Sequence, residues 1–318
     1  MSDLPPYVIN GNLYDALAEP HLGGVVMHAF CVPADKTRLQ AWLDRTFADP
    51  TDGAVRYEVM GEKVFLGIAE IDRIYTLERN GTARGYTSEI DLAIWIMARR
   101  LDDDLFTPRW IPAYLFVDSG PAMVSGREVW GFPKQLGRFD FSPPARDGGG
   151  ARTFSADGWV VSPFGPDSKA RWAPMFEVRP RAPAGKSGLL GTLEALAAKV
   201  VDRLTDDLMT FAGGVSTALG AGTMTMAFLK QFPDAAQPTR ACYQAVVEST
   251  ATVTRLRGSG LTDDHYDLRI LSYDTHPYLA ELGISSEWQD VGQGIWMDFD
   301  FLLHLGEEQW RAGGPASG

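Results

Sequence analysis

The chain has 318 residues, of which 45% are hydrophobic, and its formal net charge is -12. A sequence of this size and apolar content can bury a substantial core, which excludes intrinsic disorder, and its acidic balance without a basic cluster argues against nucleic acid or an anionic membrane as a partner. The first residues lack the basic and apolar regions of a secretory signal, and no apolar run approaches the roughly 20 residues of a spanning helix, so we expect a cytoplasmic protein.

Short β-type segments bounded by turn residues make up most of the chain. Many short strands predict an antiparallel sheet or barrel. The dipeptides Asn80-Gly81 and Asp157-Gly158 accept positive φ and favour tight hairpins, which strengthens the antiparallel interpretation over a βαβ one. In chain order, the expected strands are Val55–Met60, Val64–Ile71, Ile90–Ala98, Ile111–Val117, Gly158–Ser162, Tyr243–Leu256, Tyr266–Tyr273 and Ile295–Leu303.

A first helix is expected before these strands begin. Asp35 can cap it, because its side chain can accept a hydrogen bond from a backbone N–H in the first turn. Apolar residues at helical spacing, from Leu39 to Phe47, lie on one face and predict a helix that packs against the sheet.

A second helix is expected from about Pro121 to Trp130. Asp118 or Ser119 can cap it. Pro121 suits an early helical position, and Gly131 ends the helix. The next segment of the chain therefore begins directly after a helix stop.

A third helical element is expected in Gly188–Phe211, where leucine and valine recur every three to four residues. We interpret residues 182–222 as a helical insertion that contacts either the core or another subunit. Since roughly forty residues is near the lower limit for independent folding, the whole chain, residues 1–318, is expected to form a single domain.

Cysteine and histidine patterns point away from metal chemistry. The chain has 2 cysteines, far apart in sequence, which does not suit a disulfide framework or a structural zinc site. The five histidines show no ligand spacing. We therefore expect no metal site.

One lysine stands in unusual surroundings. Residues 126–137 read Gly-Arg-Glu-Val-Trp-Gly-Phe-Pro-Lys-Gln-Leu-Gly and place Lys134 behind a Gly-aromatic-Pro corner. Because burying an ammonium group is costly, a lysine framed by Trp130, Phe132 and Leu136 is expected to be held neutral by desolvation. A neutral amine is a nucleophile toward ketones. An exposed lysine at the start of a strand is the simpler alternative, since lysines are seldom buried.

This dodecamer closely resembles the lysine signature of the acetoacetate decarboxylase superfamily, in which Gly-Arg-Glu precedes an aromatic-Pro-Lys and the lysine forms a Schiff base with a keto acid. The resemblance implies an α+β fold, a mainly antiparallel β-barrel with flanking helices, here with the helical insertion. It also implies assembly into a homo-oligomer and no requirement for a cofactor. Looser matches extend over most of the chain, at Val64–Asp72, Gly85–Glu89, Phe228–Pro233, Tyr243–Thr250 and Ile295–Leu303.

The resemblance also implies the two catalytic residues. Lys134 resembles the Schiff-base lysine, and Glu89 resembles the glutamate that faces it across the pocket. This chain has one residue more before its glutamate than the family pattern, so Ser88 is the alternative occupant of that place, with Glu89 facing water. An inward Glu89 would position a water or move protons.

Several further residues of the matching segments are candidates for the substrate-binding pocket. Arg127 could bind a carboxylate with two parallel hydrogen bonds, or form a structural ion pair. Tyr86, Trp130 and Phe132 are expected as pocket walls, a role less common for aromatic residues than core packing.

The chain departs from the family pattern in two places. Gln135, also a candidate substrate-binding residue, stands where decarboxylases carry a second lysine. Residues 23–32 contain no counterpart of the arginine that decarboxylases place on an early strand.

The sequence therefore predicts a lyase that uses Lys134 to decarboxylate a β-keto acid, acetoacetate-like, through an iminium and an enamine. One alternative is a pyruvate-type aldolase-dehydratase that uses the same lysine. A second is a non-catalytic β-barrel that binds an apolar ligand, with Lys134 as a polar anchor. The expected partners are the small keto acid and further copies of the chain.

Overall fold

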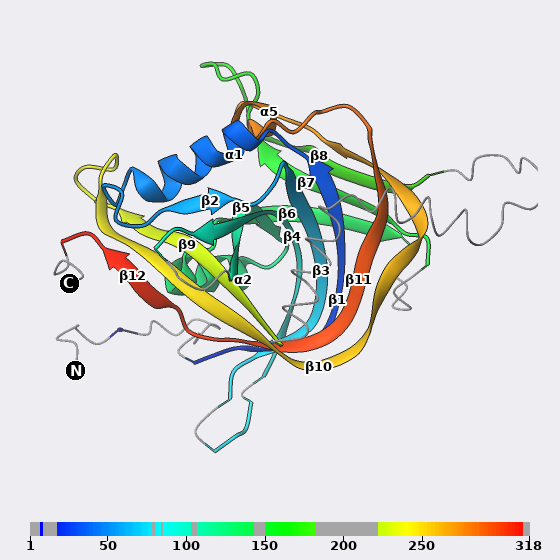
Figure 1. Cartoon of the computed structure of the whole chain (residues 1–318), viewed down its shortest axis with the longest axis horizontal. Helices are drawn as coiled ribbons and strands as arrows, with labels where there is room; N and C mark the ends of the chain where they lie inside the picture. The colour runs from blue at the N-terminus through cyan, green and yellow to red at the C-terminus, as the bar shows by residue number, and fades with distance from the viewer. Residues whose placement is uncertain are drawn as a thin grey trace, which may run out of the picture.

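A computed structural model describes residues 7–8, 18–77, 80–83, 85–102, 107–142, 150–181 and 222–313. These residues form one 12-stranded sheet with short helices beside it (Figure 1). The strands are β1 (His21–Pro33), β2 (Tyr57–Val59), β3 (Lys63–Tyr75), β4 (Thr87–Arg100), β5 (Pro108–Val117), β6 (Lys134–Ser142), β7 (Thr153–Val160), β8 (Arg171–Pro180), β9 (Thr223–Pro233), β10 (Ala241–Ile270), β11 (Gln289–Leu303) and β12 (Glu307–Arg311).

The sheet is mixed, and its strand path returns on itself. Its order is β2-β4-β3-β1-β11-β10-β8-β7-β6-β5-β9, with β12 on β10, and further pairings join β4 to β5 and β9 to β10. Only the β5–β6 and β5–β9 pairings among the described strands are parallel. The expectation of a mainly antiparallel sheet is therefore confirmed, with these two parallel pairs as the difference.

Two expected strands are parts of one long strand. Tyr243–Leu256 and the first part of Tyr266–Tyr273 both lie in β10, which pairs with β9 at one end and with β8 at the other. Four register shifts against β11 interrupt it. Such bulges bend a strand and increase its twist, so one strand can serve two sets of neighbours.

The two expected hairpins have different outcomes. Asn80-Gly81 lies between the antiparallel strands β3 and β4, and Gly81 has φ of 79°, as expected. The expectation of a hairpin at Asp157-Gly158 is wrong, because both residues lie inside β7 beside a register shift. A Cβ on Gly158 would overlap the sulfur of Met175. This glycine is present for close packing instead of a turn.

The first helix forms as expected. α1 (Lys36–Leu43) is capped by Asp35, whose side chain accepts a 2.9 Å hydrogen bond from the Arg38 N–H, and it continues as the π-helical segment η1 (Asp44–Ala48). Its buried residues include Leu39 and Phe47, which pack on one face of the sheet. The short helix α5 (Tyr278–Leu282) contacts α1.

The second helix leads the chain into β6. α2 (Gly120–Ser125) is capped by Ser119 and continues as the π-helical segment η2 (Gly126–Trp130), which ends at Gly131 with φ of 95°. A Cβ at Gly131 would lie 2.7 Å from the Lys230 Cα, so both the backbone conformation and the space demand glycine.

The expected helix at Gly188–Phe211 lies outside the described residues, as does nearly all of the insertion at 182–222. The expectation of one domain across residues 1–318 therefore stays a prediction.

Two apolar clusters lie on opposite faces of the sheet. Because successive side chains of a strand point to opposite faces, Leu66 and Ile68 of β3 belong to the cluster beneath α1, while Phe65 and Ala69 belong to the other. The second cluster surrounds the candidate site described below.

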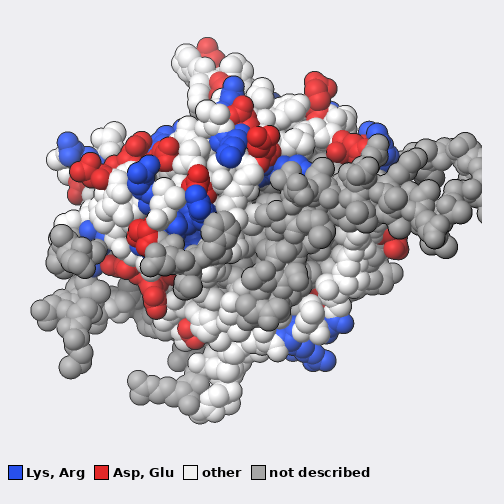
Figure 2. Space-filling view, viewed as in Figure 1, with Lys and Arg blue, Asp and Glu red and all other residues white. Residues whose placement is uncertain are grey.

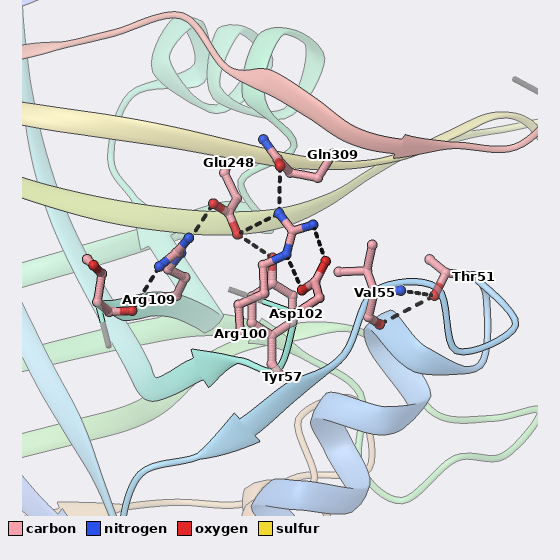
Figure 3. A network of polar contacts seen from close by, with 9 residues as sticks. Thr51, Val55, Tyr57, Arg100, Asp102, Arg109, Glu248 and Gln309 are labelled. Carbon is pink, nitrogen blue, oxygen red and sulfur yellow. Dashed lines mark hydrogen bonds and ion pairs between the residues drawn. The ribbon is translucent and has the colours of Figure 1, made fainter. Parts of the chain in front are cut away.

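A buried polar network joins strands that meet at one end of the sheet (Figure 3). Glu248 of β10 accepts hydrogen bonds from Tyr57 at 2.8 Å and from Arg109 at 3.2 Å. Arg100, at the end of β4, lies 3.7 Å from the same carboxylate and bonds Gln309 of β12 at 2.6 Å. Glu248 therefore neutralises the buried Arg109. Burial, together with the negative charge of Glu248, raises the pKa of Tyr57.

The described surface carries both signs of charge. Figure 2 shows basic and acidic side chains interspersed over the described part of one face. No helix among the described residues is long and apolar enough to cross a membrane.

Candidate active site

The helix stop delivers Lys134 to the start of a strand. Lys134 is the first residue of β6, where it pairs in parallel with Leu115 of β5. Its side chain passes close to the backbone of Gly126 in the preceding π-helical turn, since a Cβ there would lie 2.7 Å from the Lys134 Cδ. The glycine at the start of the motif therefore makes room for the lysine at its end.

Lys134 and Glu89 form an ion pair. The Lys134 Nζ donates a 2.6 Å hydrogen bond to the Glu89 Oε1, and the two side chains are 12% and 2% exposed. Ser88 is exposed, so Glu89 of β4 is the residue that faces inward. The Nζ also lies 5.6 Å from the centre of the Phe132 ring.

A second carboxyl group, Asp91, lies beside this pair. Burial, together with the negative charge of Glu89, raises the pKa of Asp91 to about 8, while the Lys134 ammonium acts in the opposite direction. A carboxyl with this pKa is mostly protonated at neutral pH and can donate a proton. Asp91 was not among the site residues expected from the sequence. The signal was present, because residues two apart on a strand point to the same face.

These three ionisable side chains lie in the wall of an otherwise mostly apolar cavity of about 190 Å³. Apart from Thr223, the rest of the lining is apolar or aromatic and comes from β1, β3, β4, β5, β9, β10 and β11, with Phe132 from the corner before β6. Such a site can take a mainly apolar molecule whose reactive group meets Lys134.

Of the expected pocket walls, the structure brings only Phe132 to the cavity. Trp130 is buried nearby, where its ring N–H donates a 2.9 Å hydrogen bond to the His304 carbonyl. Tyr86 is 66% exposed and lies against Arg73, outside this cavity. Trp130 thus anchors the end of the helix, and Tyr86 contacts solvent.

Arg127 and Gln135 also lie outside the cavity. The exposed Arg127 side chain donates a 3.1 Å hydrogen bond to the Lys134 carbonyl oxygen, so it supports the backbone of the motif. Gln135 points to the opposite face of β6 from Lys134, where its Oε1 lies 2.9 Å from the His276 Nε2. Burial lowers the pKa of His276. The alternation of a strand thus separates Gln135 from Lys134.

Lys134 is the only cationic side chain that lines the cavity among the described residues. The two most buried arginines of the described residues are paired elsewhere: Arg109 of β5 with Glu248, and Arg152, just before β7, with Glu70 at 2.6 Å. The described residues also contain no group of three or more His, Cys, Asp or Glu side chains that could hold a metal ion.

Comparisons with known proteins agree with the fold and with the Lys134 segment. Residues 81–157 match the family model for acetoacetate decarboxylase (ADC). No curated protein sequence matches the chain.

Solved structures of related fold cover nearly the whole chain. The acetoacetate decarboxylase of Legionella pneumophila is 14% identical, with a TM-score of 0.59, covering 98% of this chain and 94% of that one. An acetoacetate decarboxylase-like enzyme from Sphingomonas wittichii RW1 is 12% identical, with a TM-score of 0.57, covering 98% of this chain and 100% of that one. The enduracididine biosynthesis enzyme MppR, complexed with pyruvate, is 14% identical, with a TM-score of 0.53, covering 94% of this chain and 92% of that one. The segment around Lys134 therefore matches the acetoacetate decarboxylase model, and the chain shares its fold with acetoacetate decarboxylase and acetoacetate decarboxylase-like structures.

Proposed function

We propose that this protein is a Schiff-base-forming lyase that decarboxylates a β-keto acid through Lys134. The observation that carries this proposal is the Lys134–Glu89 pair, with its 2.6 Å contact, in the wall of an otherwise mostly apolar cavity. Such a cavity excludes water from an amine and brings a carboxylate within proton-transfer distance of it.

The proposed reaction begins when Glu89 accepts a proton from Lys134. The neutral Nζ attacks the substrate ketone to form a carbinolamine, and the hydroxyl group leaves as water after it receives a proton from Asp91. The resulting iminium withdraws electrons, so the bond to the carboxylate breaks, carbon dioxide leaves, and the bonding electrons form a neutral enamine. The protonated Glu89 then gives its proton to the enamine carbon, which forms the iminium of the product. Water adds to this iminium and loses a proton to Asp91, the ketone leaves, and the free Lys134 amine takes up one proton from solvent, which restores the starting state.

The environment of Asp91 suits this role. Because burial, together with the charge of Glu89, raises the pKa of Asp91 to about 8, Asp91 holds a proton at neutral pH, while its neighbour Glu89 is paired with the Lys134 ammonium. Two adjacent carboxyls in different protonation states can act as the acid and the base of one reaction.

The cavity favours decarboxylation over an aldol reaction of pyruvate. Pyruvate keeps its carboxylate throughout an aldol reaction and therefore needs a lasting cationic partner, but no cation besides Lys134 lines the cavity among the described residues. A β-keto acid loses its carboxylate. In its iminium form, the positive nitrogen lies close to the carboxylate, and an apolar wall favours the neutral enamine over this zwitterion.

Borohydride trapping tests the Schiff base. The protein is incubated separately with acetoacetate and with pyruvate, reduced with sodium borohydride, and mapped by peptide mass spectrometry. Lys230→Arg is the matched control, because Lys230 is a partly buried lysine whose pKa is lowered by burial, yet its Nζ donates to the Val129 carbonyl and it does not line the cavity.

We expect an adduct on Lys134 in the wild type and in Lys230→Arg, and none in Lys134→Arg. The absence of any adduct on Lys134 would reject the Schiff base and favour a non-catalytic binder. Carbon dioxide release from acetoacetate supports decarboxylation, whereas condensation of pyruvate with an aldehyde without carbon dioxide release supports the aldolase-dehydratase alternative. Homo-oligomeric assembly and a cytoplasmic location also stay predictions, and light scattering would test the first.

A further inference from the structure

The cavity extends well beyond the three ionisable side chains. Strands β4, β3, β1 and β11 are neighbours in the sheet, so their paired residues form rows across the cavity wall. Each row begins with a carboxyl group on β4 and continues with apolar residues. The rows are Glu89, Ile71, Val25 and Phe299, and then Asp91, Ala69, Met27 and Met297.

This wall is long compared with a short keto acid. Neighbouring strands lie about 4.8 Å apart, so the three spacings from β4 to β11 give roughly 14 Å of wall. The four carbons of acetoacetate are joined by three bonds of about 1.5 Å, which span at most about 4.5 Å. Acetoacetate held at Lys134 would leave most of the apolar wall without a partner.

The empty space suits an apolar group. The volume of about 190 Å³ exceeds the roughly 150 Å³ of a dry apolar cavity that binds benzene. Small side chains on three strands, Ala29, Ala69 and Ala251, leave this space open. Met27 and Met297 add flexible side chains that adapt to different shapes.

Building on the function proposed above, we propose that this site takes 3-oxo acids with an apolar tail of about four to six carbons in preference to acetoacetate or pyruvate. The ketone and carboxylate lie at Lys134, and the tail follows the apolar rows toward β11. The tail supplies the affinity that no guanidinium among the described cavity residues supplies through the carboxylate.

The expected preference follows from the buried area. Each methylene that moves from water into an apolar site improves binding roughly fourfold. 3-Oxooctanoate has four methylenes more than acetoacetate, so its kcat/KM should be higher by on the order of 100-fold. The direct measurement is carbon dioxide release from the two acids under the same conditions. Equal values, or a preference for acetoacetate, would overturn the inference.

A cavity-filling variant tests where the tail lies. Ala251, on β10, pairs with Leu303 of β11 and Met224 of β9, and β10 is a direct neighbour of neither β4, which carries Glu89, nor β6, which carries Lys134. Ala251→Phe, with the milder Ala251→Leu in case the larger residue prevents folding, should lower the ratio of the two kcat/KM values at least tenfold. Leu256→Phe is the control, because Leu256 lies on the same strand but is 47% exposed, and it should keep the wild-type ratio. An unchanged ratio in both Ala251 variants would overturn the placement.

A separate experiment distinguishes this inference from the function on which it rests. Trapping by borohydride with acetone and with 2-heptanone measures the effect of a tail without any decarboxylation. Half-saturation on Lys134 at a lower concentration of 2-heptanone supports the inference even if no acid releases carbon dioxide. Equal half-saturation refutes the tail preference while leaving the Schiff base intact. If neither ketone labels Lys134, the Schiff-base function and the inference both fail.

Discussion

Gly126 leaves room for the Lys134 side chain, and a single methyl group there should lower activity without lowering the free energy of unfolding. Its backbone is helical, with φ of -60° and ψ of -42°, so alanine fits the local conformation. The added Cβ would lie 2.7 Å from the Lys134 Cδ and 2.9 Å from its Cε. Since carbon atoms pack at about 3.5–4.0 Å, the lysine must move by about 0.8 Å or more.

The expected effect on activity is large because the lysine has a fixed partner. Its Nζ makes a 2.6 Å contact with Glu89, and a shift of this size breaks that geometry. A displacement near 1 Å can cost roughly 100-fold in rate. The protein should still fold, because the displaced atoms belong to a flexible side chain. Replacing a helical glycine with alanine also raises the free energy of unfolding by about 0.5–1 kcal/mol.

The assay combines two measurements on Gly126→Ala: kcat/KM for carbon dioxide release from 3-oxooctanoate, and the free energy of unfolding in urea. Gly120→Ala is the matched control, because Gly120 begins the same helix and a Cβ there meets nothing within 4 Å. We expect a roughly 100-fold loss of kcat/KM only in Gly126→Ala, with both variants at least as stable as the wild type. Wild-type activity in Gly126→Ala, or loss of its folded state, would refute the prediction that only the Lys134 side chain moves to make room for the added Cβ.

Three further predictions concern the groups around Lys134. Lys134→Met leaves Glu89 buried without its partner and should cost about 3–5 kcal/mol in urea unfolding, and adding Glu89→Gln should recover most of that loss. Because the pKa of Asp91 is about 8 in the folded state against an ordinary 3.8, the folded protein holds a proton that the unfolded chain releases, and stability is lost as pH rises between those values. Asp91→Asn should therefore lose less stability than the wild type between pH 5 and pH 9, and equal losses would contradict the assignment. Gln135→Met removes the 2.9 Å contact with buried His276 and should cost about 1–3 kcal/mol in stability without changing KM. A raised KM would indicate instead that Gln135 contacts the substrate.

Local sequence signals predicted the helix boundaries well, because capping depends on neighbouring residues. Asp35 and Ser119 cap their helices as expected, and Gly131 ends the second. β1 was missed since Gly23 and Gly24 interrupt its pattern. In the structure, Gly24 takes φ of 64° beside a register shift, and the strand continues on both sides.

Strand alternation explains why the candidate site was only partly predicted. Lys134 and Gln135 are adjacent in sequence but lie on opposite faces of β6, whereas Glu89 and Asp91 are two apart and lie on the same face. A motif read along the chain groups neighbours and overlooks this separation.

The sequence by itself determined the mainly antiparallel sheet, the helix stop before Lys134 and the resemblance of the Lys134 segment to acetoacetate decarboxylases, because each depends on residues close together in the chain. Only the tertiary structure decided that Glu89 faces the lysine instead of Ser88, that Asp91 joins them, and that the rest of the wall is apolar apart from Thr223. These facts depend on strand register and on which strands become neighbours. Both are set by long-range packing of the whole sheet, because a shift of one residue along a strand would turn every side chain to the other face.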